Sequence, residues 1–372
     1  MKHTADSNAP SMQPRRSATI WSRLLRYGVP PVITIGLCYL LFTGVDMHEM
    51  ARIIRTECRF GYIALALVIS IFSHVFRAMR WRIQLNALGI RTPLGIIILS
   101  IFGTYAVNLV LPRLGELWRT GYIASRQRAP FSTVFGSMIC DRLSDTITVF
   151  LLTLLAFVVA QPQIVSYLQQ NPDTYTRLMA VIASPALWIT VTAVALLCIA
   201  LCHRFPHSRI VTALRSLLSG IWQGFAVVGR MEGKVLWLLY TALIWGCYFT
   251  QLYVCFYAFP LTADVAGEFG PTAVLVCFVL SSLSMAVPSN GGIGPYQWAL
   301  MFGLSMYASG VPGLTREYAL SFGNTVMGCQ TLLLILLGII TFVLISIDRH
   351  HNKPTGDDQC HVPAKSTDNV SD

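Results

Sequence analysis

Two carboxylates stand in a stretch of sequence that is otherwise apolar enough to enter a membrane. Asp141 and Asp145 are four residues apart, so on a helix they share one face, and Arg142 lies between them in the chain. Like charges on one face repel unless a cation lies between them, and Arg113, Arg119 or the cationic head of a lipid would supply it. Ionisable side chains in a membrane segment usually face a cavity and serve a function, so the pair predicts a binding site. The alternative is a cytoplasmic helix start, where carboxylates complement the helix dipole.

Two further pairs of charged residues have helical spacing. Arg77 and Arg80 are three residues apart at the end of an apolar run, and Trp81 follows them. They suit the capture of a phosphate by planar guanidinium groups, or else the anchoring of a helix at the cytoplasmic surface beside an interfacial tryptophan. Glu116 and Arg119 are also three apart, which predicts an ion pair, either within the membrane or on an interfacial surface helix.

Two breaks interrupt the apolar segments near these charges. Residues 108–116 include Pro112 and Gly115, and residues 286–295 include two prolines and three glycines. Proline removes a backbone donor and glycine relaxes the backbone, so each break frees polar backbone groups that lipid cannot satisfy. Interrupted segments in corresponding places of two halves point to the substrate site of a transporter. The alternative is a pair of ordinary loops near the membrane surface.

Each break offers its own binding chemistry. A half-helix that begins after Pro112 would aim its backbone N–H groups into the membrane, which creates a site for an anion. The second break offers neutral amides, and glycines that let a ligand approach the backbone closely. The candidate binding residues are Asn108, Arg113 and Glu116 in the first break, and Asn290, Gly291, Gly292, Gly294 and Gln297 in or just after the second.

The composition indicates which elements must position these residues. The chain has 372 residues, of which 54% are hydrophobic and 12% charged, about half the charged fraction of a soluble domain. Its net charge of +10 comes from cations at the ends of apolar runs, which indicates membrane topology and attraction to anionic lipid rather than binding of nucleic acid. The ten cysteines lie mostly in apolar runs and suggest neither a disulfide framework nor a zinc site. The sequence contains no recognised catalytic, nucleotide-binding or metal-binding motif, so we expect no cofactor and no metal.

The apolar runs predict an all-α polytopic membrane protein with about six full transmembrane helices and two broken or re-entrant hairpins. We further hypothesise that the two halves of the chain, each with one hairpin, are inverted repeats. We expect a cytoplasmic polar arm over 1–24, a transmembrane domain over 25–348 and a disordered cytoplasmic tail over 349–372. The predicted full spans are 27–44, 60–76, 132–160, 185–202, 235–257 and 319–347, and the predicted hairpins are 93–112 and 271–310.

Arginine-rich segments set the predicted orientation, because short cytoplasmic loops carry an excess of Lys and Arg. Both termini are therefore expected in the cytoplasm, and residues 161–184, which carry few charges, are predicted as an external loop. The segments predicted as cytoplasmic are 1–26, 82–92, 113–130, 204–234 and 349–372.

Four short motifs occur in order between about residues 25 and 347. They are Arg77-x-x-Arg80-Trp81, Asn108-x-x-x-Pro112-x-x-Gly115-Glu116-x-x-Arg119, Asp141-Arg142 and Pro288-x-x-Gly291-Gly292-x-Gly294. In these motifs the chain resembles the membrane domain of bacterial lysylphosphatidylglycerol synthases and the stand-alone flippase-like proteins of the UPF0104 group. The chain departs from the family at Gln297, where a glutamate is frequent, and this departure argues against a cationic, lysyl-type substrate.

The resemblance implies an inner-membrane protein that binds or translocates a polar lipid or glycerophospholipid. In the full synthases this domain moves the aminoacylated lipid between leaflets, and a separate soluble domain attaches the lysine. The present chain ends soon after its last predicted span, so we expect a lipid transporter and not an enzyme. The expected partners are a membrane lipid, and a second copy or a separate lipid-synthesising enzyme. The alternatives are a membrane-embedded lipid-modifying transferase, with Asp141 or Glu116 as general base, and a scaffold of a membrane complex.

Overall fold

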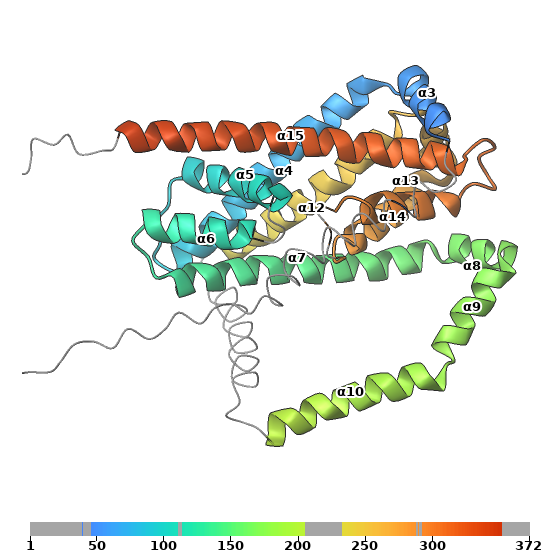
Figure 1. Cartoon of the computed structure of the whole chain (residues 1–372), viewed down its shortest axis with the longest axis horizontal. Helices are drawn as coiled ribbons and strands as arrows, with labels where there is room; N and C mark the ends of the chain where they lie inside the picture. Colours follow the sequence, from blue (N-terminus) through green and yellow to red (C-terminus); the bar gives the residue numbers. More distant parts are fainter. Residues whose placement is uncertain are drawn as a thin grey trace, which may run out of the picture.

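The structure, a computed structural model, is all α-helical in the part of the chain that it describes (Figure 1). The described residues are 39, 46–110, 114–204, 233–287, 289 and 292–351. The first helices are α3 (Met47–Glu57), α4 (Phe60–Ala87), α5 (Leu94–Val110), α6 (Gly115–Arg126) and α7 (Phe131–Val159). They are followed by α8 (Gln161–Gln170), α9 (Pro172–Ile182), α10 (Pro185–Arg204), α12 (Lys234–Phe256), α13 (Pro260–Ser284), α14 (Pro295–Ser305) and α15 (Arg316–His351).

Among the described residues, five helices are long and apolar enough to cross a membrane, namely α4, α7, α12, α13 and α15. Helix α5 is apolar but shorter. A span needs about 20 residues to cross the hydrocarbon layer. The prediction of an all-α polytopic membrane protein is therefore confirmed. The predicted span 27–44 lies outside the described residues except for Tyr39, and α10 occupies the predicted span 185–202.

Three segments differ from their predicted limits. Helix α4 does not end at residue 76, because the next eleven residues contain no proline or glycine and α7 supplies carboxylates for its arginines. The predicted loop 161–184 contains α8 and α9, each of which has a proline in its first turn, where the missing N–H costs nothing. Helix α13 begins before residue 271 and bends at Gly270, which has a φ of 65°.

The first hairpin consists of α5 packed against α6, so it does not lie within the predicted limits 93–112. Helix α5 continues to Val110, and the second arm of the hairpin, α6, belongs to the segment 113–130 that the charge pattern predicts as cytoplasmic. Across its break, the backbone N–H of Gly115 donates a hydrogen bond to Oδ1 of Asn108 at 2.8 Å. A Cβ atom at Gly115 would collide with the carbonyl oxygen of Thr104 and with Asn108, so this approach requires glycine. The ring of Trp118 lies where a side chain on Gly103 would be. The two helices are therefore held together by two glycines and the groups that fill their empty positions.

The second hairpin consists of α13 packed against α14. Gly292 and Gly294 have φ values of 85° and 94°, in the left-handed region that favours glycine. The side chain of Gln297, which is buried, accepts a hydrogen bond from the backbone N–H of Gly294 at 2.8 Å. This bond fixes the start of α14, where Pro295 occupies a position that favours proline.

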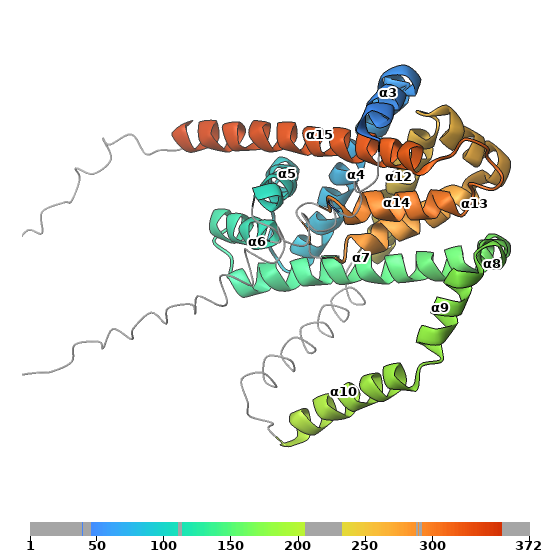
Figure 2. The same ribbon diagram turned by 45° about the vertical axis from the view of Figure 1, so that its right-hand side comes forward.

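Helix α15 contacts both hairpins, so the positions of the two hairpins can be compared along its length. Gly292 lies beside Met327 of α15, and Ala106 lies against Gly338 of α15. These two positions on α15 are roughly 16 Å apart at a rise of 1.5 Å per residue. Figures 1 and 2 place α5 and α6 in one half of the long axis and α13 and α14 in the other. The two hairpins therefore occupy opposite halves of the bundle.

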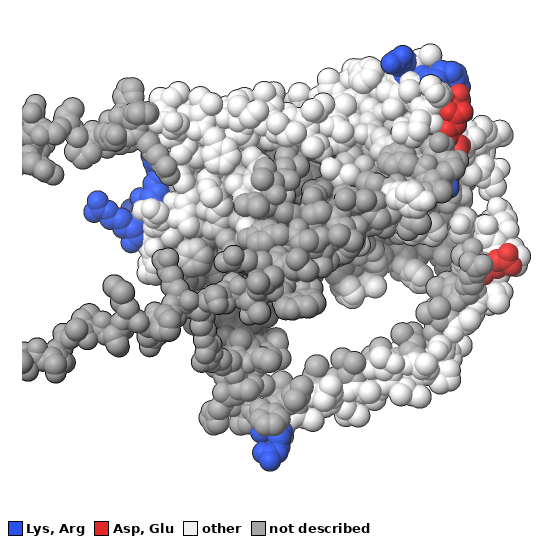
Figure 3. Space-filling model, in the orientation of Figure 1, with Lys and Arg blue, Asp and Glu red and all other residues white. Residues whose placement is uncertain are grey.

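In Figure 3 the charged side chains of the described residues lie at the two ends of the bundle and at the free end of α10. At the end near α6 and the C-terminal part of α15 they are basic, and at the opposite end acidic and basic side chains occur together. The described surface between the two ends of the bundle shows almost no charged side chains, which suits a surface in contact with lipid.

Two hydrophobic clusters support the hairpins. The larger one includes Phe256, Phe259 and Phe322, which are fully buried and pack edge to face beside the second hairpin. The smaller one joins α4 to the first hairpin through residues such as Trp81 and Ile123. Arg80, which precedes Trp81, is thereby held at the edge of the smaller cluster.

Candidate functional site

The centre of the candidate site is Arg80 of α4, which lies between the two carboxylates of α7. Its Nη2 atom is 2.7 Å from Oδ1 of Asp141 and 2.8 Å from Oδ1 of Asp145, and its Nε atom donates to the same oxygen of Asp141 at 3.0 Å. Arg80 and Asp141 are fully buried. The cation predicted from the four-residue spacing of the carboxylates is therefore present, and it comes from α4.

Two further arginines surround this centre. Nη1 of Arg77 lies 3.2 Å from Oδ2 of Asp145. Nη2 of Arg142 lies 3.2 Å from Oε1 of Glu116, and its Nη1 is 3.9 Å from Asp145. Asp145 is thus shared by three guanidinium groups, so a change in one ion pair alters the others.

The structure pairs Glu116 with Arg142, not with Arg119 as the three-residue spacing predicts. The guanidinium group of Arg119 lies over the ring of Trp81, 4.2 Å from its centroid, with Nη2 at 3.8 Å from Oδ2 of Asp141. A guanidinium group stacks favourably on an aromatic face. Contacts with α4 and α7 therefore outweigh the pairing within α6, and Arg119 joins the network through another helix.

The resulting buried ion network joins α6 to α4 and α7, two helices that are long and apolar enough to cross a membrane. Arg80 is about seven residues from the end of α4, and Asp141 is about ten residues from the start of α7, which puts the network roughly 10–15 Å from these helix ends. The hydrocarbon layer is about 30 Å thick, and charges at such depth are costly unless they are paired. The buried ion network consists of Arg77, Arg80, Glu116, Arg119, Asp141, Arg142 and Asp145.

The polar residues Asn108 and Glu116, on either side of the first break, lie at this network. Nδ2 of Asn108 is 3.5 Å from Oε2 of Glu116, while its Oδ1 atom closes the break. The predicted site residue Arg113 lies outside the described residues. Asn108 is therefore both a structural element of the turn and a neighbour of the network.

The second break has a different environment. The amide of Gln297 is occupied by Gly294, and its side chain packs against Gly323 of α15. Gly292 faces Met285 and Met327. The predicted site residues Asn290 and Gly291 lie outside the described residues. The contacts found for the described part of this break are with its own turn and with apolar side chains, and none joins it to the buried ion network.

Helix α12 contributes neighbours that sequence reasoning missed. The hydroxyl of Tyr248 accepts a hydrogen bond from Arg77 at 3.1 Å, and that of Thr241 accepts one from Arg80 at 3.4 Å. The ring of Trp237 lies 5.9 Å from the guanidinium carbon of Arg80. These three residues recur at intervals of four and seven, which puts their polar groups on one face of an apolar helix. This spacing is the signal from which they could have been found.

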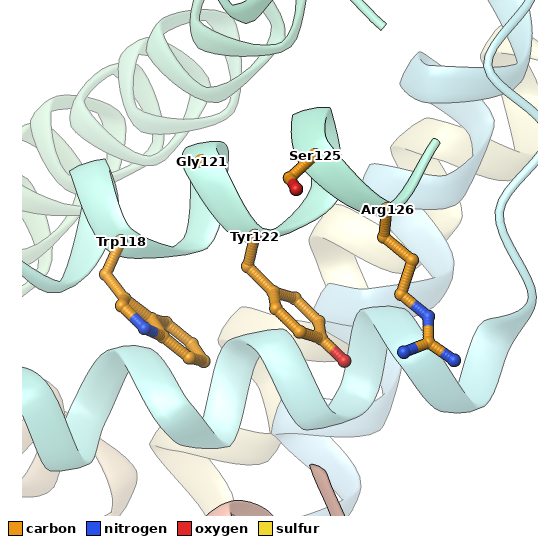
Figure 4. Close-up of a pocket in the computed structure, with 5 residues that line it drawn as sticks. All are labelled: Trp118, Gly121, Tyr122, Ser125 and Arg126. Carbon is orange, nitrogen blue, oxygen red and sulfur yellow. The ribbon is translucent and has the colours of Figure 1, made fainter. Parts of the chain in front are cut away.

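Two hollows lie on the surface of helices that contribute to the network or contact it. One, of about 450 Å³, lies along the face of α6 from which Trp118, Tyr122 and Arg126 project in a row (Figure 4). Arg126 pairs with Asp348 of α15, and this hydrogen bond raises the pKa of the guanidinium group above its ordinary value. The other hollow, also of about 450 Å³, is an apolar groove between α4 and α12.

Comparison with known proteins assigns the chain to a family. The family described as the lysylphosphatidylglycerol synthase transmembrane region matches residues 29–338. The chain is also 33% identical over 119 residues to a protein named glycosyltransferase AglD of Haloferax volcanii, a match that covers 32% of this chain and only 19% of that protein. No solved structure shows significant similarity to the chain. The chain belongs to the lysylphosphatidylglycerol synthase transmembrane-region family.

Proposed function

We propose that the protein moves a polar lipid between the two leaflets of the cytoplasmic membrane. The observation that carries the proposal is the buried ion network at the tip of a broken hairpin, within a bundle of membrane-crossing helices. A protein that only had to be stable would gain from apolar residues at these positions, because a buried ion pair is often weaker than a hydrophobic contact of the same size. Retained charges at this depth therefore favour a role in binding a polar head group.

The way in which the network is assembled suits a transporter. Its members come from α4, α6 and α7, and α12 adds hydroxyl groups, so a relative movement of these helices exchanges one set of partners for another. A lipid head group that enters the network would offer replacement partners during such a movement. Its presence therefore lowers the cost of separating the charges, and this coupling is what a transport cycle requires.

The groove between α4 and α12 supplies a place for an acyl chain beside the head group. It is lined by Ile69, Phe72 and Phe76 of α4 and by five residues of α12. Phe76 adjoins Arg77 in the chain, and the α12 lining begins at Ala242, next to Thr241. A lipid whose head contacts the network could therefore keep an acyl chain in this groove, and the apolar tail would remain in an apolar environment.

The distribution of charge also gives the proposed orientation. In Figure 3 the end of the bundle near α6 and the C-terminal part of α15 shows basic side chains alone, whereas the opposite end shows basic and acidic ones, and the positive-inside rule favours a cytoplasmic position for the first. Both termini of the chain are then cytoplasmic. The first hairpin would open toward the cytoplasm and the second toward the opposite side.

Reconstituted vesicles test the proposed transport directly. We expect wild-type protein to make acyl-labelled fluorescent glycerophospholipids of the inner leaflet accessible to dithionite added outside. Asp141→Asn should abolish this activity, because it leaves Arg80 without its fully buried partner. Glu49→Gln, which alters an exposed ion pair on α3, is the matched control and should leave it unchanged. Normal lipid movement by folded Asp141→Asn protein would exclude the network from transport.

A second candidate function is the transfer of a group to or from a lipid. The observation that favours it is the name of the relative from Haloferax volcanii, a glycosyltransferase. Glu116, which is partly exposed, would be the better general base, because Asp141 is held by Arg80. Mass spectrometry of lipids incubated with purified protein and sugar donors would detect a product. A product that is lost in Glu116→Gln would favour transfer, and transbilayer movement of unaltered lipid would favour transport.

A further inference from the structure

The buried ion network contains more positive than negative charge. Among the described residues it has four guanidinium groups and three carboxylates. The imbalance is greatest where burial is greatest, because the members with side chains at most 5% exposed are three arginines and one aspartate. An uncompensated buried charge is costly, so the network favours the binding of an anion. The three deeply buried arginines are Arg77, Arg80 and Arg119, and the aspartate is Asp141.

Several arginines of the network have buried nitrogen atoms without a hydrogen-bond partner, but Arg77 and Arg142 each lie 3.2 Å from a carboxylate, whereas Arg119 does not approach one closer than 3.8 Å. Its side chain is 1% exposed, and neither its Nε nor its Nη2 atom has a hydrogen-bond partner. These two atoms form one edge of the guanidinium group, where two parallel N–H donors match the two oxygens of a phosphate or carboxylate. The oxygen Oδ2 of Asp141 lies 3.8 Å from Nη2, beyond hydrogen-bonding distance, and the other oxygen of that carboxylate is bonded to Arg80.

The network also has acceptors without donors. The Oδ2 atoms of Asp141 and Asp145 are buried and make no hydrogen bond. Asp141 lies 2.7 Å from Arg80 and Asp145 lies 3.2 Å from Arg77, so their negative charge is compensated without Arg119 and an additional cation is not required. A hydroxyl group satisfies such an acceptor without adding charge. A ligand that suits both the donors of Arg119 and the free acceptors of Asp141 and Asp145 therefore combines one oxyanion with neutral hydroxyl donors.

We propose that the network selects lipids whose head is a single phosphodiester joined to a polyol, with one net negative charge. The phosphate oxygens bind the Nε and Nη2 edge of Arg119, and a hydroxyl of the polyol donates to Oδ2 of Asp141. Heads that carry an amine are disfavoured, because they bring positive charge to a site that already has an excess of it. This inference rests on the proposed function only in taking a membrane lipid as the ligand.

Binding by the purified full chain in detergent provides the first test. The probes are short-chain phosphatidylglycerol, phosphatidylcholine and lysylphosphatidylglycerol, with inorganic phosphate as a fourth arm, all measured by calorimetry. Phosphatidylglycerol should bind about tenfold more tightly than the zwitterionic and cationic lipids, as expected for one charge-assisted hydrogen-bonded contact. Equal affinity for the three lipids would overturn the inference. Inorganic phosphate that binds as tightly as phosphatidylglycerol would overturn the assignment of a lipid.

Variants of Arg119 locate the selectivity. Arg119→Met should remove the preference for phosphatidylglycerol, and Arg119→Lys, which keeps the charge but lacks the two-donor edge, should weaken its binding several-fold. Arg126→Met is the matched control, because Arg126 is on the same helix but pairs with Asp348 at the surface. Without lipid, Arg119→Met should melt at the same temperature as the wild type or higher, since it removes an uncompensated buried charge. A folded Arg119→Lys protein with wild-type selectivity would contradict the assignment.

The vesicle assay separates this inference from the proposed function. Transbilayer movement that is equally fast for anionic, zwitterionic and cationic lipids would support transport and overturn the selectivity. Selective binding of phosphatidylglycerol that depends on Arg119, without any movement of lipid, would support the site and overturn transport.

Discussion

The two hairpins have similar breaks, rich in proline and glycine, but they bury different chemistry. The first closes its break with the side chain of Asn108 and brings Glu116 and Arg119 into an ion network shared with α4 and α7. The second closes its break with Gln297 and packs beside the larger hydrophobic cluster. In each turn an amide side chain therefore accepts a hydrogen bond from a backbone N–H group. Among the described residues, only the first hairpin also contributes charged side chains to a site that it shares with other helices.

The comparison shows that a broken helix and a binding site are separate properties. A break requires only that its backbone donors find acceptors, which one amide accomplishes in each hairpin. A site requires unmet donors or acceptors, and among the described residues those of the arginines and aspartates gather beside the first hairpin. The following predictions test how far this asymmetry extends.

The largest expected effect follows from Asp141→Asn, which removes the fully buried carboxylate on which Arg80 depends. Breaking one partner of a buried ion pair costs about 3–5 kcal/mol, so the midpoint of thermal unfolding in detergent should fall markedly. Asp264→Asn is the matched control, because Asp264 is an exposed aspartate of the second hairpin. Equal unfolding midpoints for the two variants would mean that the charges of the first hairpin are solvated.

Gly115→Ala should have the next largest effect. Its Cβ atom would overlap the carbonyl oxygen of Thr104, and such overpacking typically costs about 1–3 kcal/mol. Gly121→Ala on the same helix meets open space and should gain stability by about 0.5–1 kcal/mol. Chemical unfolding of the two variants measures the difference. If both gain stability, the close approach of α5 and α6 is not required.

Gln297→Glu tests the second hairpin. The change keeps an acceptor for the backbone N–H of Gly294 but adds a charge beside the larger hydrophobic cluster, so stability should fall by about 1 kcal/mol or more. The selectivity among anionic, zwitterionic and cationic lipids should remain that of the wild type, because Gln297 is engaged within its own turn. A shift of binding toward cationic lipids would place Gln297 in the site and make the two hairpins equivalent.

The smallest expected effect belongs to the ion pair between Glu116 and Arg142. Their side chains are 22% and 38% exposed, so solvent screens the pair and its coupling energy should be below about 1 kcal/mol. A double-mutant cycle with Glu116→Gln and Arg142→Gln, measured at low and high salt, gives this value. A coupling energy above about 2 kcal/mol that is insensitive to salt would show that this pair is as well shielded from solvent as the pair of Arg80 and Asp141.

Sequence reasoning named all seven members of the network but not their pairing. The spacing of Asp141 and Asp145 required a cation, because two carboxylates on one face repel, and this argument holds whatever supplies the charge. The identity of that cation depends on how α4 packs against α7, which no local spacing encodes. The spacing offered Arg119 two partners, Glu116 and the carboxylates of Asp141 and Asp145, and only the packing places it beside Asp141 and over Trp81.

The helical class could be predicted because apolar runs of about 20 residues have one favourable conformation in a bilayer. The end of α4 could not, because arginines at the end of an apolar run indicate a membrane surface unless their partners are known. Tyr248 and Thr241 escaped detection for a related reason. Neutral hydroxyl groups are common in apolar helices, and their role becomes visible only when a guanidinium group faces them.

Helix α15 meets each hairpin at a glycine, and this has a mechanical consequence. Gly338 lies against Ala106 of α5, and Gly323 lies against Gln297 of α14. Small residues let helix backbones approach closely, so α15 packs tightly against each hairpin at one position. The ion pair of Arg126 with Asp348, which is partly exposed, adds a further contact between α15 and the first hairpin. Because one helix touches both hairpins, a larger side chain at either glycine would displace one hairpin relative to the other.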